Sequence, residues 1–375
     1  MGDGVSEDKA YSGYLLRGLR SWDTSRWTTA MIGRKIIFFL GAGASRGAKA
    51  TANVPGGTVD IPLQSEFWQT VLRFANKVDR ARVESLLFKY FAGYRRVPSR
   101  VHGITRTRLL SEIDVEEVFT FLSERSRAPS TSKQLKTYVD EVWNLLVSAV
   151  GVAFRRFAPN ARTRRIFRAL MENHIRSRDA VVSFNYDTIF EESLPGNFEW
   201  HYPCVSTGRE GLRILKPHGS VNWILNENRS IACSPTSDQN PVLVAPTHLK
   251  FVRSNGATSP ASDGNDSGNL PAGYLDLFPQ VQEIWAEMEQ QMSIAKALVF
   301  VGYSFPVADL YFSSVLRSVL ASRRARPNVV IVNPDAVAVG ARVTARFKLR
   351  KPTLYFDLEQ FVYTSRTRLL QTLLE

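Results

Sequence analysis

The stretch IIFFLGAGAS at residues 36–45 places five apolar residues directly before a run of small ones. Uninterrupted apolar and β-branched residues are typical of a strand covered on both faces in a parallel sheet. Gly41, Gly43 and Ser45 then leave the backbone nearly bare, which suits the approach of backbone N–H groups to a phosphate at a helix start. A glycine-rich strand end also occurs in proteins that bind no nucleotide. The stretch therefore predicts a buried strand and leaves the phosphate site open.

The composition is that of a soluble protein with a substantial core. The chain has 375 residues, of which 44% are hydrophobic, and this length predicts two compact units or one domain with a large insertion. Its two cysteines, Cys204 and Cys233, are too few for a four-cysteine zinc site, and we expect no metal. The sequence shows no targeting segment, and its apolar runs are too short to cross a membrane, so we expect a cytoplasmic protein.

The formal net charge of +13 is concentrated in two stretches. Residues 94–108 contain five arginines and no acid, and residues 155–178 contain eight arginines and only one acid, Glu172. Such a field attracts nucleic acid or an anionic ligand, but it is also typical of a solvated helical surface or an oligomer interface. No zinc-finger, basic-zipper or ribonucleoprotein signature accompanies the charge. Nucleic-acid binding stays open but is not favoured.

Short apolar runs bounded by Gly or Pro alternate with helical patterns. The predicted strands are 35–40, 180–184, 213–216, 241–245, 297–302 and 328–333. Apolar residues at helical spacing run from Val281 to Ala295, just before the fifth of these strands. This alternation predicts an α/β fold, a Rossmann-like, doubly wound and mainly parallel sheet.

The long segment between the first two predicted strands contains helical patterns at 112–124 and 138–153. A crossover of this length predicts an inserted helical domain. The segment 250–272 is rich in Ser, Gly, Asn and Asp, so we expect a mobile loop or lid there. The expected domains are an N-terminal arm at 1–30, a nucleotide-binding domain made of 31–65 and 179–375, and a helical insertion at 66–178.

Two later motifs offer polar chemistry at predicted strand ends. SFNYD (183–187) places Asn185 and Asp187 where a sugar hydroxyl or a water could bind, although the same residues suit the cap of the following helix. LKPHGS (215–220) places His218 on a tight turn, where an imidazole can transfer protons near neutral pH, although a lone histidine is more often structural. We discount His102, His174, His201 and His248.

Two further strands end in FVGYS (300–304) and IVNPD (331–335). Gly302, Ser304 and Asn333 in these motifs could contact a phosphate or a ribose, whereas we expect Asp309 to cap a helix. Ligands of open α/β sheets bind at the carboxyl ends of the strands. One dinucleotide lying across that edge would account for all five motifs together.

The order of the motifs, GAG-x-S, N-x-D, HG, G-x-S and I-x-N, resembles that of the sirtuin fold over residues 31–65 and 179–340. The resemblance implies an NAD-binding domain. The residues expected to hold the pyrophosphate are Gly41, Ala42, Gly43 and Ser45. Those expected at the adenosine end are Gly302, Ser304 and Asn333, and those expected around the nicotinamide ribose are Asn185, Asp187 and His218.

Two features depart from the sirtuin deacetylases. The four-cysteine zinc module is missing, and VPGGTVDIPLQSEFW (54–68) stands where those enzymes have a G-I-P-D-F-R-like stretch. The chain is more similar to the sirtuin-like NADases of bacterial antiphage defence, which implies that NAD+ is its substrate and that water is the acceptor. Asn185 would then position the water, His218 would take a proton from the ribose or the water, and Asp187 would orient the ribose or the nicotinamide amide.

Unregulated NAD+ hydrolysis would kill a cell, so we expect the activity to be gated by homo-oligomerisation or by a partner protein. Sirtuin-like subunits of this size are similar to the NADase half of two-component systems that contain a HerA-type ATPase. The arginine-rich helical insertion is the predicted contact surface. Two alternatives stay open: a sirtuin-type deacetylase or ADP-ribosyltransferase, and a non-catalytic module that senses NAD or ADP-ribose and docks a partner or nucleic acid through a basic face.

Overall fold

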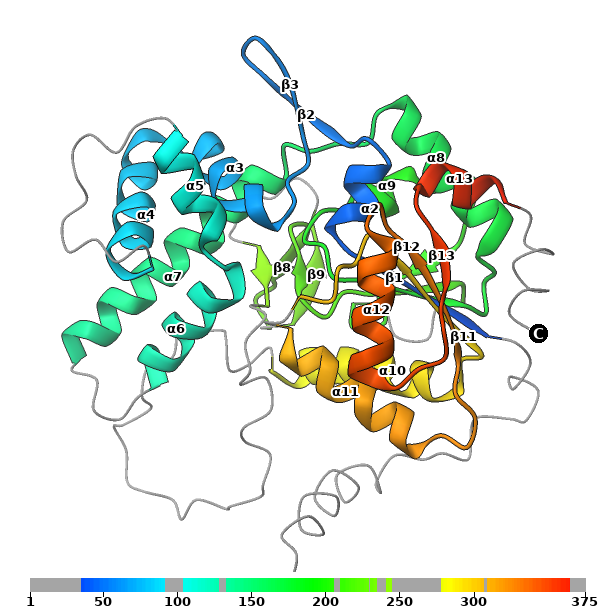
Figure 1. Ribbon diagram of the computed structural model, residues 1–375. Helices are drawn as coiled ribbons and strands as arrows, with labels where there is room; N and C mark the ends of the chain where they lie inside the picture. The colour runs from blue at the N-terminus through cyan, green and yellow to red at the C-terminus, as the bar shows by residue number, and fades with distance from the viewer. Residues whose placement is uncertain are drawn as a thin grey trace, which may run out of the picture.

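The centre of the molecule is a seven-stranded sheet in which every neighbouring pair of strands is parallel, flanked by helices (Figure 1). The computed structural model describes residues 35–91, 104–127, 133–205, 210–228, 230–234, 241–244, 278–306 and 309–364. In sheet order the strands are β13 (Thr353–Tyr355), β12 (Asn328–Val332), β11 (Ala297–Val301), β1 (Ile36–Leu40), β4 (Ala180–Ser183), β6 (Leu212–Leu215) and β5 (Trp200–His201).

Strand β1 lies in the middle because all five of its side chains are apolar, and each is at most 1% exposed. It pairs with β11 on one side and with β4 on the other. Phe39 stacks on Phe300 of β11, with their ring centroids 4.6 Å apart. The run IIFFL therefore forms the buried parallel strand that its sequence predicts.

The strand order is that of a Rossmann-like, doubly wound sheet. Without the two-residue edge strand β5, the order β6-β4-β1-β11-β12-β13 corresponds to the 3-2-1-4-5-6 arrangement. The chain moves outward from β1 through β4 and β6, then returns to β11 on the other side of β1. The predicted Rossmann-like, doubly wound sheet is confirmed, and its topological switch point lies between β1 and β11.

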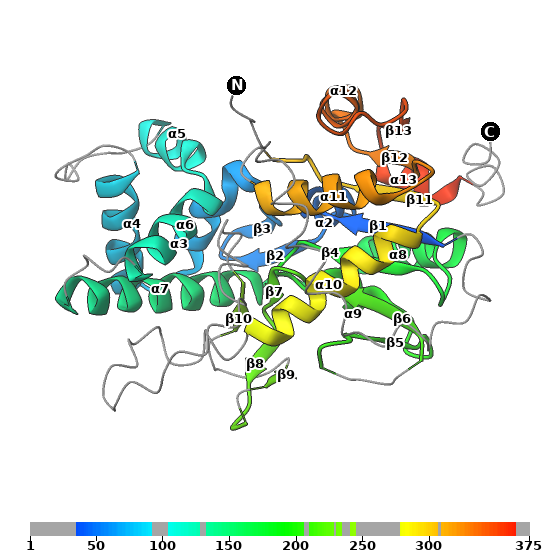
Figure 2. The ribbon, with the colours of Figure 1, turned by 90° about the horizontal axis from the view of Figure 1, so that it is seen from below.

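Helices cover the sheet and connect its strands (Figure 2). They are α2 (Ala42–Gly47), α8 (Ala161–His174), α9 (Ile189–Ser193), α10 (Phe278–Ile294), α11 (Leu310–Ser322), α12 (Ala336–Phe347) and α13 (Leu358–Tyr363). The helical pattern from Val281 to Ala295 lies in α10, apart from its last residue. Asp309 caps α11 as predicted, because its side chain accepts a hydrogen bond from the Phe312 N–H.

One predicted strand lies elsewhere. The segment 241–245 was expected beside the others, but β10 (Val242–Leu243) pairs antiparallel with β7 (Gly219–Ser220), outside the central sheet. The apolar run is buried against the turn that follows β6, and this burial explains its hydrophobic sequence equally well. Two more small antiparallel pairs are β2 (Thr51–Val54) with β3 (Gly57–Asp60), and β8 (Trp223–Leu225) with β9 (Ile231–Cys233).

Between β3 and β4 the described chain is helical. A short 3-10 turn, η3 (Gln64–Glu66), leads into α3 (Phe67–Phe74), α4 (Lys77–Tyr90), α5 (Ile104–Glu112), α6 (Val115–Arg127) and α7 (Lys133–Phe154). These helices pack on one another beside the sheet (Figure 1). Trp68 is fully buried among them and donates from its indole nitrogen to the Ile113 carbonyl at 3.1 Å.

The predicted helices 112–124 and 138–153 correspond to α6 and to the larger part of α7. Helix α6 begins later than predicted because the Asp114 carboxylate accepts the Glu116 backbone N–H at 2.7 Å and so starts the helix there. Helix α8, which also lies within 66–178, packs on α13 and α9. Asn173 on α8 donates to the Val362 carbonyl at 2.8 Å. The segment 250–272 lies outside the described residues, as do the whole of the predicted arm and residues 94–103.

Candidate functional site at the carboxyl edge of the sheet

The five sequence motifs meet at one edge of the sheet. They follow β12, β11, β1, β4 and β6, which are consecutive neighbours and all parallel, so their carboxyl ends lie side by side. Along this edge the motif residues are, in order, Asn333, then Gly302 and Ser304, then Gly41 to Ser45, then Asn185 and Asp187, and finally His218. This is the edge at which sheets of this topology bind their ligands.

The glycines at the switch point hold two loops in backbone contact. The Gly41 N–H donates to the Val301 carbonyl and the Gly43 N–H donates to the Gly302 carbonyl, both at 3.0 Å. A Cβ on Gly43 would lie 2.8 Å from the Gly302 Cα. Gly302 has φ of 62°, and a Cβ there would lie 2.0 Å from the Ala44 nitrogen. Only glycine allows this approach.

These contacts bear on the predicted pyrophosphate site. Two of the N–H groups expected to face the phosphates, those of Gly41 and Gly43, donate within the protein, while Ala42 is exposed at the start of α2. Ser45 is buried and turns toward the neighbouring loop. The contact of these residues with a pyrophosphate stays a prediction.

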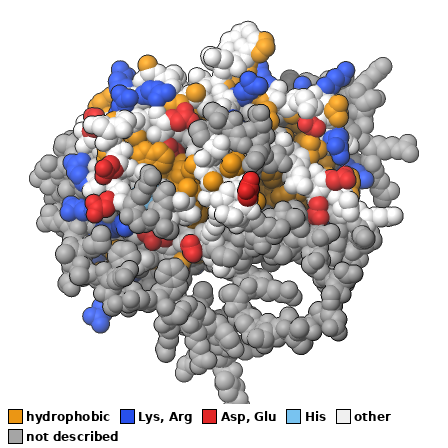
Figure 3. Space-filling model, turned by 180° about the vertical axis from the view of Figure 1, so that it is seen from behind, with side chains coloured by type: hydrophobic (Ala, Val, Ile, Leu, Met, Phe, Trp, Pro, Cys, Tyr) orange, Lys and Arg blue, Asp and Glu red, His pale blue; other side chains and the backbone are white. Residues whose placement is uncertain are grey.

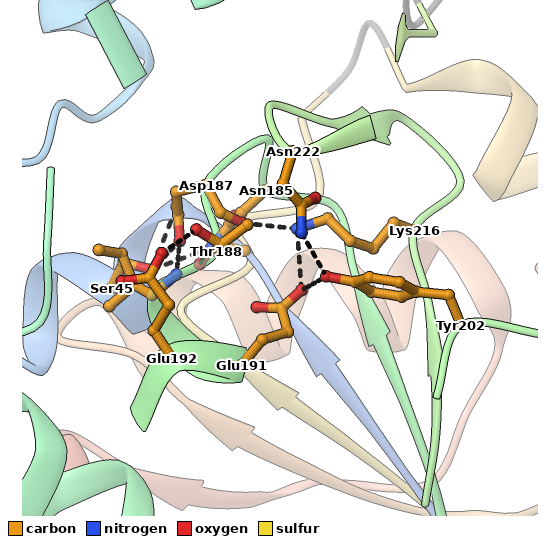
Figure 4. A network of polar contacts seen from close by, with 11 residues as sticks. Ser45, Asn185, Asp187, Thr188, Glu191, Glu192, Tyr202, Lys216 and Asn222 are labelled. Atoms are coloured by element: carbon orange, nitrogen blue, oxygen red, sulfur yellow. Dashed lines mark hydrogen bonds and ion pairs between the residues drawn. The ribbon is translucent and has the colours of Figure 1, made fainter. Parts of the chain in front are cut away.

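Ser45, Asn185 and Asp187 form a polar cluster between the loops after β1 and β4 (Figure 4). The Ser45 hydroxyl donates to the two carboxylate oxygens of Asp187 at 3.2 and 3.3 Å. The Asn185 side-chain amide donates to Ser45 Oγ at 3.2 Å and to the Gly41 carbonyl at 3.1 Å. The first two motifs, more than a hundred residues apart in the chain, therefore form one site.

Asp187 takes the helix-start role that its sequence suggests, and its contact with a sugar or a water stays a prediction. Its Oδ1 accepts the Ile189 backbone N–H at 3.0 Å, which fixes the start of α9, and the same carboxylate accepts the Ser45 hydroxyl. Burial raises the pKa of Asp187 to about 6. The Lys216 ammonium opposes this rise, the Glu191 carboxylate adds to it, and the Ile189 and Ser45 hydrogen bonds oppose it. A carboxyl with this pKa can gain or lose a proton near neutral pH.

His218 lies beside this cluster on the turn after β6. Its ring is buried, with the ring centroid of Phe184 at 5.3 Å and that of Tyr186 at 6.5 Å. The turn requires the glycine that follows, because Gly219 has φ of 80° and a Cβ there would lie 2.2 Å from the Val242 carbonyl oxygen. The imidazole is therefore held against the loop that carries Asn185 and Asp187.

The residues predicted for the adenosine end have partners in the protein. The Asn333 side-chain oxygen accepts the Asp335 backbone N–H at 2.9 Å, a turn that precedes α12. Ser304 is exposed, and its carbonyl accepts a hydrogen bond from Arg342 at 3.0 Å. The ribose and phosphate contacts assigned to Gly302, Ser304 and Asn333 stay predictions.

Sequence reasoning missed a buried ion pair behind the site. Lys216 stands in the quoted motif LKPHGS, but its ammonium is fully buried and donates to the Glu191 carboxylate at 3.1 Å and to the Asp187 backbone carbonyl at 2.5 Å. The Tyr202 hydroxyl donates to the same Glu191 oxygen at 3.0 Å. The available signal was a lysine that directly follows the apolar pair Ile214 and Leu215 at the end of a strand.

A cavity of about 450 Å³ borders this ion pair. It contacts the network through Thr188, Glu191, Tyr202 and Asn222 (Figure 4), and its other lining residues are Arg155, Phe157, Glu192, Trp200, His201, Val205, Val221 and Cys233. Its volume lies in the range of small-molecule sites.

Of the discounted histidines, His201 lines this cavity, His174 stacks on Phe361 at 4.6 Å, and the other two lie outside the described residues.

Most arginines of residues 155–178 lie on the surface and bond to neighbouring groups of the same chain. Six of the arginines there donate to carboxylates or backbone carbonyls: Arg155 to Val221, Arg162 and Arg165 to Glu359, Arg164 to Glu192, Arg168 to Ser193, and Arg176 to Glu172. On the face shown in Figure 3, cationic, anionic and apolar side chains are interspersed. A contact surface for a partner on this stretch stays a prediction.

Among the described residues, no group of three His, Cys, Asp or Glu side chains could hold a metal ion, and none of the helices is long and apolar enough to span a bilayer. No protein-family model matches the chain, and no curated protein is significantly similar to it. The link to sirtuin-like proteins therefore rests on the five motifs.

Proposed function

We propose that this protein is an NAD+ glycohydrolase that cleaves NAD+ into ADP-ribose and nicotinamide. The observation that carries the proposal is the polar cluster of Ser45, Asn185 and Asp187 at the carboxyl edge of a sheet with 3-2-1-4-5-6 order. Dinucleotides bind at that edge, next to the switch point. The cluster borders the switch point through Ser45, and His218 lies on the far side of the cluster, after β6. We place the nicotinamide ribose of a bound dinucleotide between them.

The proposed reaction breaks the bond between the ribose C1′ and the nicotinamide nitrogen, and the electron pair of that bond leaves with nicotinamide. A water oxygen then bonds to C1′ and its proton is taken up by a base. The Asn185 amide nitrogen already donates to Gly41 and Ser45, so its side-chain oxygen is the atom assigned to orient the water. His218 is assigned as the proton acceptor and Asp187 as the group that orients the ribose or the nicotinamide amide.

The wider role that we propose is NAD+ depletion in antiphage defence, with the activity gated by homo-oligomerisation or by a HerA-type ATPase. The support for this role is the order of the five motifs together with the missing zinc module.

The test is incubation of the purified full chain with NAD+, with and without the candidate ATPase, followed by chromatography of the products. Nicotinamide and ADP-ribose formed without a protein acceptor would support the proposal. Products that require an acetylated peptide or a protein acceptor would indicate the deacetylase or transferase alternative, and binding of ADP-ribose without turnover would indicate the sensor. Asn185→Ala and His218→Ala should each abolish turnover, and unchanged NAD+ consumption in both would refute the assignment.

A further inference from the structure

The ion pair between Lys216 and Glu191 is almost completely buried. The Lys216 side chain is 0% exposed and that of Glu191 is 3% exposed. Removing two charges from water costs several kcal/mol per ion, and a buried pair can often be replaced by apolar side chains without loss of stability. The pair therefore calls for an explanation in addition to folding.

The contacts of Lys216 supply such an explanation. Its ammonium reaches across to the loop after β4 and donates to the backbone carbonyl of Asp187, while Glu191 anchors it on α9. Lys216 also lies two residues before His218, and the Gly219 N–H donates to the Lys216 carbonyl at 3.0 Å. One residue thus connects the turn that carries His218 with the loop that carries Asp187.

A second layer of hydrogen bonds holds Glu191 in place. The Tyr202 hydroxyl donates to Glu191 Oε1, and the Asn222 amide donates to the Tyr202 hydroxyl at 3.5 Å. In Figure 4 these side chains form a chain of contacts that extends from the Ser45 cluster to Tyr202 and Asn222, two residues that line the cavity. The loops after β4, β5 and β6 are therefore joined through a single carboxylate.

We propose that Lys216 and Glu191 are positioning residues, which fix the backbone of Asp187 relative to His218 and balance the charge around the Asp187 carboxyl. This proposal rests on the proposed NAD+ hydrolase function and adds two residues to its machinery. Neither residue has to touch NAD+. They act through Asp187 and through the two turns that they connect.

The charges around Asp187 make the proposal specific. Lys216 on the β6 side lowers the pKa of the Asp187 carboxyl, and Glu191 on α9 raises it, with Lys216 the larger of the two effects. Ser45 on α2 and the Ile189 N–H also face the carboxyl. The other ionisable groups around the network are His218 after β6, Tyr202 and Cys233 near Glu191, and Glu192, Arg155 and His201 on the cavity wall.

The two variants are Lys216→Met and Glu191→Gln. The first removes the ammonium at similar length, and the second keeps an acceptor for Lys216 and Tyr202 while removing the negative charge. Lys35→Met and Glu287→Gln are the matched controls, because Lys35 is buried at the opposite end of β1 and Glu287 pairs with Arg213 at 3.5 Å at that same end of the sheet. The controls lose a similar charge far from the site.

The first readout does not depend on NAD+. For each variant, the free energy of unfolding is measured against pH with and without Asp187→Asn, and the difference gives the pH at which Asp187 titrates. We expect this pH to rise in Lys216→Met, to fall in Glu191→Gln and to stay unchanged in both controls. If the titration pH of Asp187 shifts in the same direction in both variants, or in neither, the proposal is overturned. A purely structural role of the ion pair gives no reason for shifts in opposite directions.

The second readout is NAD+ turnover by the full chain with whatever partner activates it. We expect kcat to fall about 10- to 100-fold in both variants with little change in KM, because displacing a reacting group by about 1 Å can cost a hundredfold. If both variants keep the wild-type kcat, the positioning role is refuted and the proposed NAD+ hydrolase function is not. Absence of NAD+ cleavage by the wild-type chain would refute the proposed function, which the first readout does not use.

Discussion

Replacing Asp187 by Asn removes a buried carboxyl whose pKa lies at about 6 instead of its ordinary 3.8. Asn keeps the oxygen that accepts the Ile189 N–H and takes away the charge. At a pH between the two pKa values, the carboxyl holds a proton in the folded protein and has lost it in the unfolded protein. Its stability contribution is therefore complete below about pH 4 and disappears as the pH rises through about 6.

The size of the effect follows from the shift. About two pH units at about 1.4 kcal/mol per unit give a loss on the order of 3 kcal/mol between pH 4 and pH 7. Asp187 is only 3% exposed, so solvent screens this effect little. Burial of the charged form is the largest cause of the shift, and a neutral amide is free of this penalty. Relative to the wild type, Asp187→Asn should therefore gain stability as the pH rises.

The assay is urea unfolding of both proteins at pH values from 4 to 7.5, with the difference in the free energy of unfolding plotted against pH. Subtraction cancels the titration of all other groups that the substitution leaves unchanged. We expect the difference to rise by about 2–3 kcal/mol, with its midpoint between the two pKa values. A difference that stays constant over this range would show that Asp187 has the same pKa in the folded and the unfolded protein, and the account of its environment would be wrong.

Three further predictions concern the switch point, the proposed base and the helical core. Gly43→Val should abolish NAD+ binding, measured by calorimetry, and destabilise the protein by about 1–3 kcal/mol, because its Cβ would lie 2.8 Å from the Gly302 Cα. Gly196→Ala is the control, because its Cβ meets nothing within 4 Å. Intact NAD+ binding by Gly43→Val would contradict the prediction that these glycines hold the pyrophosphate. His218→Ala should stop nicotinamide release while the circular dichroism spectrum stays that of the wild type, and continued release would remove His218 from the mechanism. Trp68→Phe should lower the free energy of unfolding by about 1–3 kcal/mol, because it leaves a buried carbonyl without its indole donor, and an unchanged value would show that this hydrogen bond contributes nothing.

The sequence predicts the central strands well because parallel strands covered on both faces need continuous apolar runs, as in IIFFL. It does not predict β5 or β13, which have two and three residues and are too short for a hydrophobic pattern. The run at 241–245 shows the opposite difficulty. Its burial was predictable, but an apolar segment of this length does not reveal which strand it will pair with.

The candidate site likewise combines residues that could be predicted from the sequence with residues that could not. Asn185, Asp187 and Ser45 were predictable candidates because each lies just after an apolar strand, and parallel topology brings such ends together. Lys216 and Glu191 were not, since a sequence shows a charge without showing whether it turns into the protein. The burial of Lys216 depends on a carboxylate and a backbone carbonyl 25 and 29 residues away, and only the folded chain brings them together.

The contact among Gly41, Gly43 and Gly302 has a consequence for how this protein can vary. At each of the three positions the atoms nearest to an added Cβ belong to the backbone of the facing loop, so a change of side chain elsewhere does not make room for it. Losing one glycine would separate the loops and remove the reason for the other two. Among proteins descended from a common ancestor with this chain, the three glycines should be retained or lost as a set.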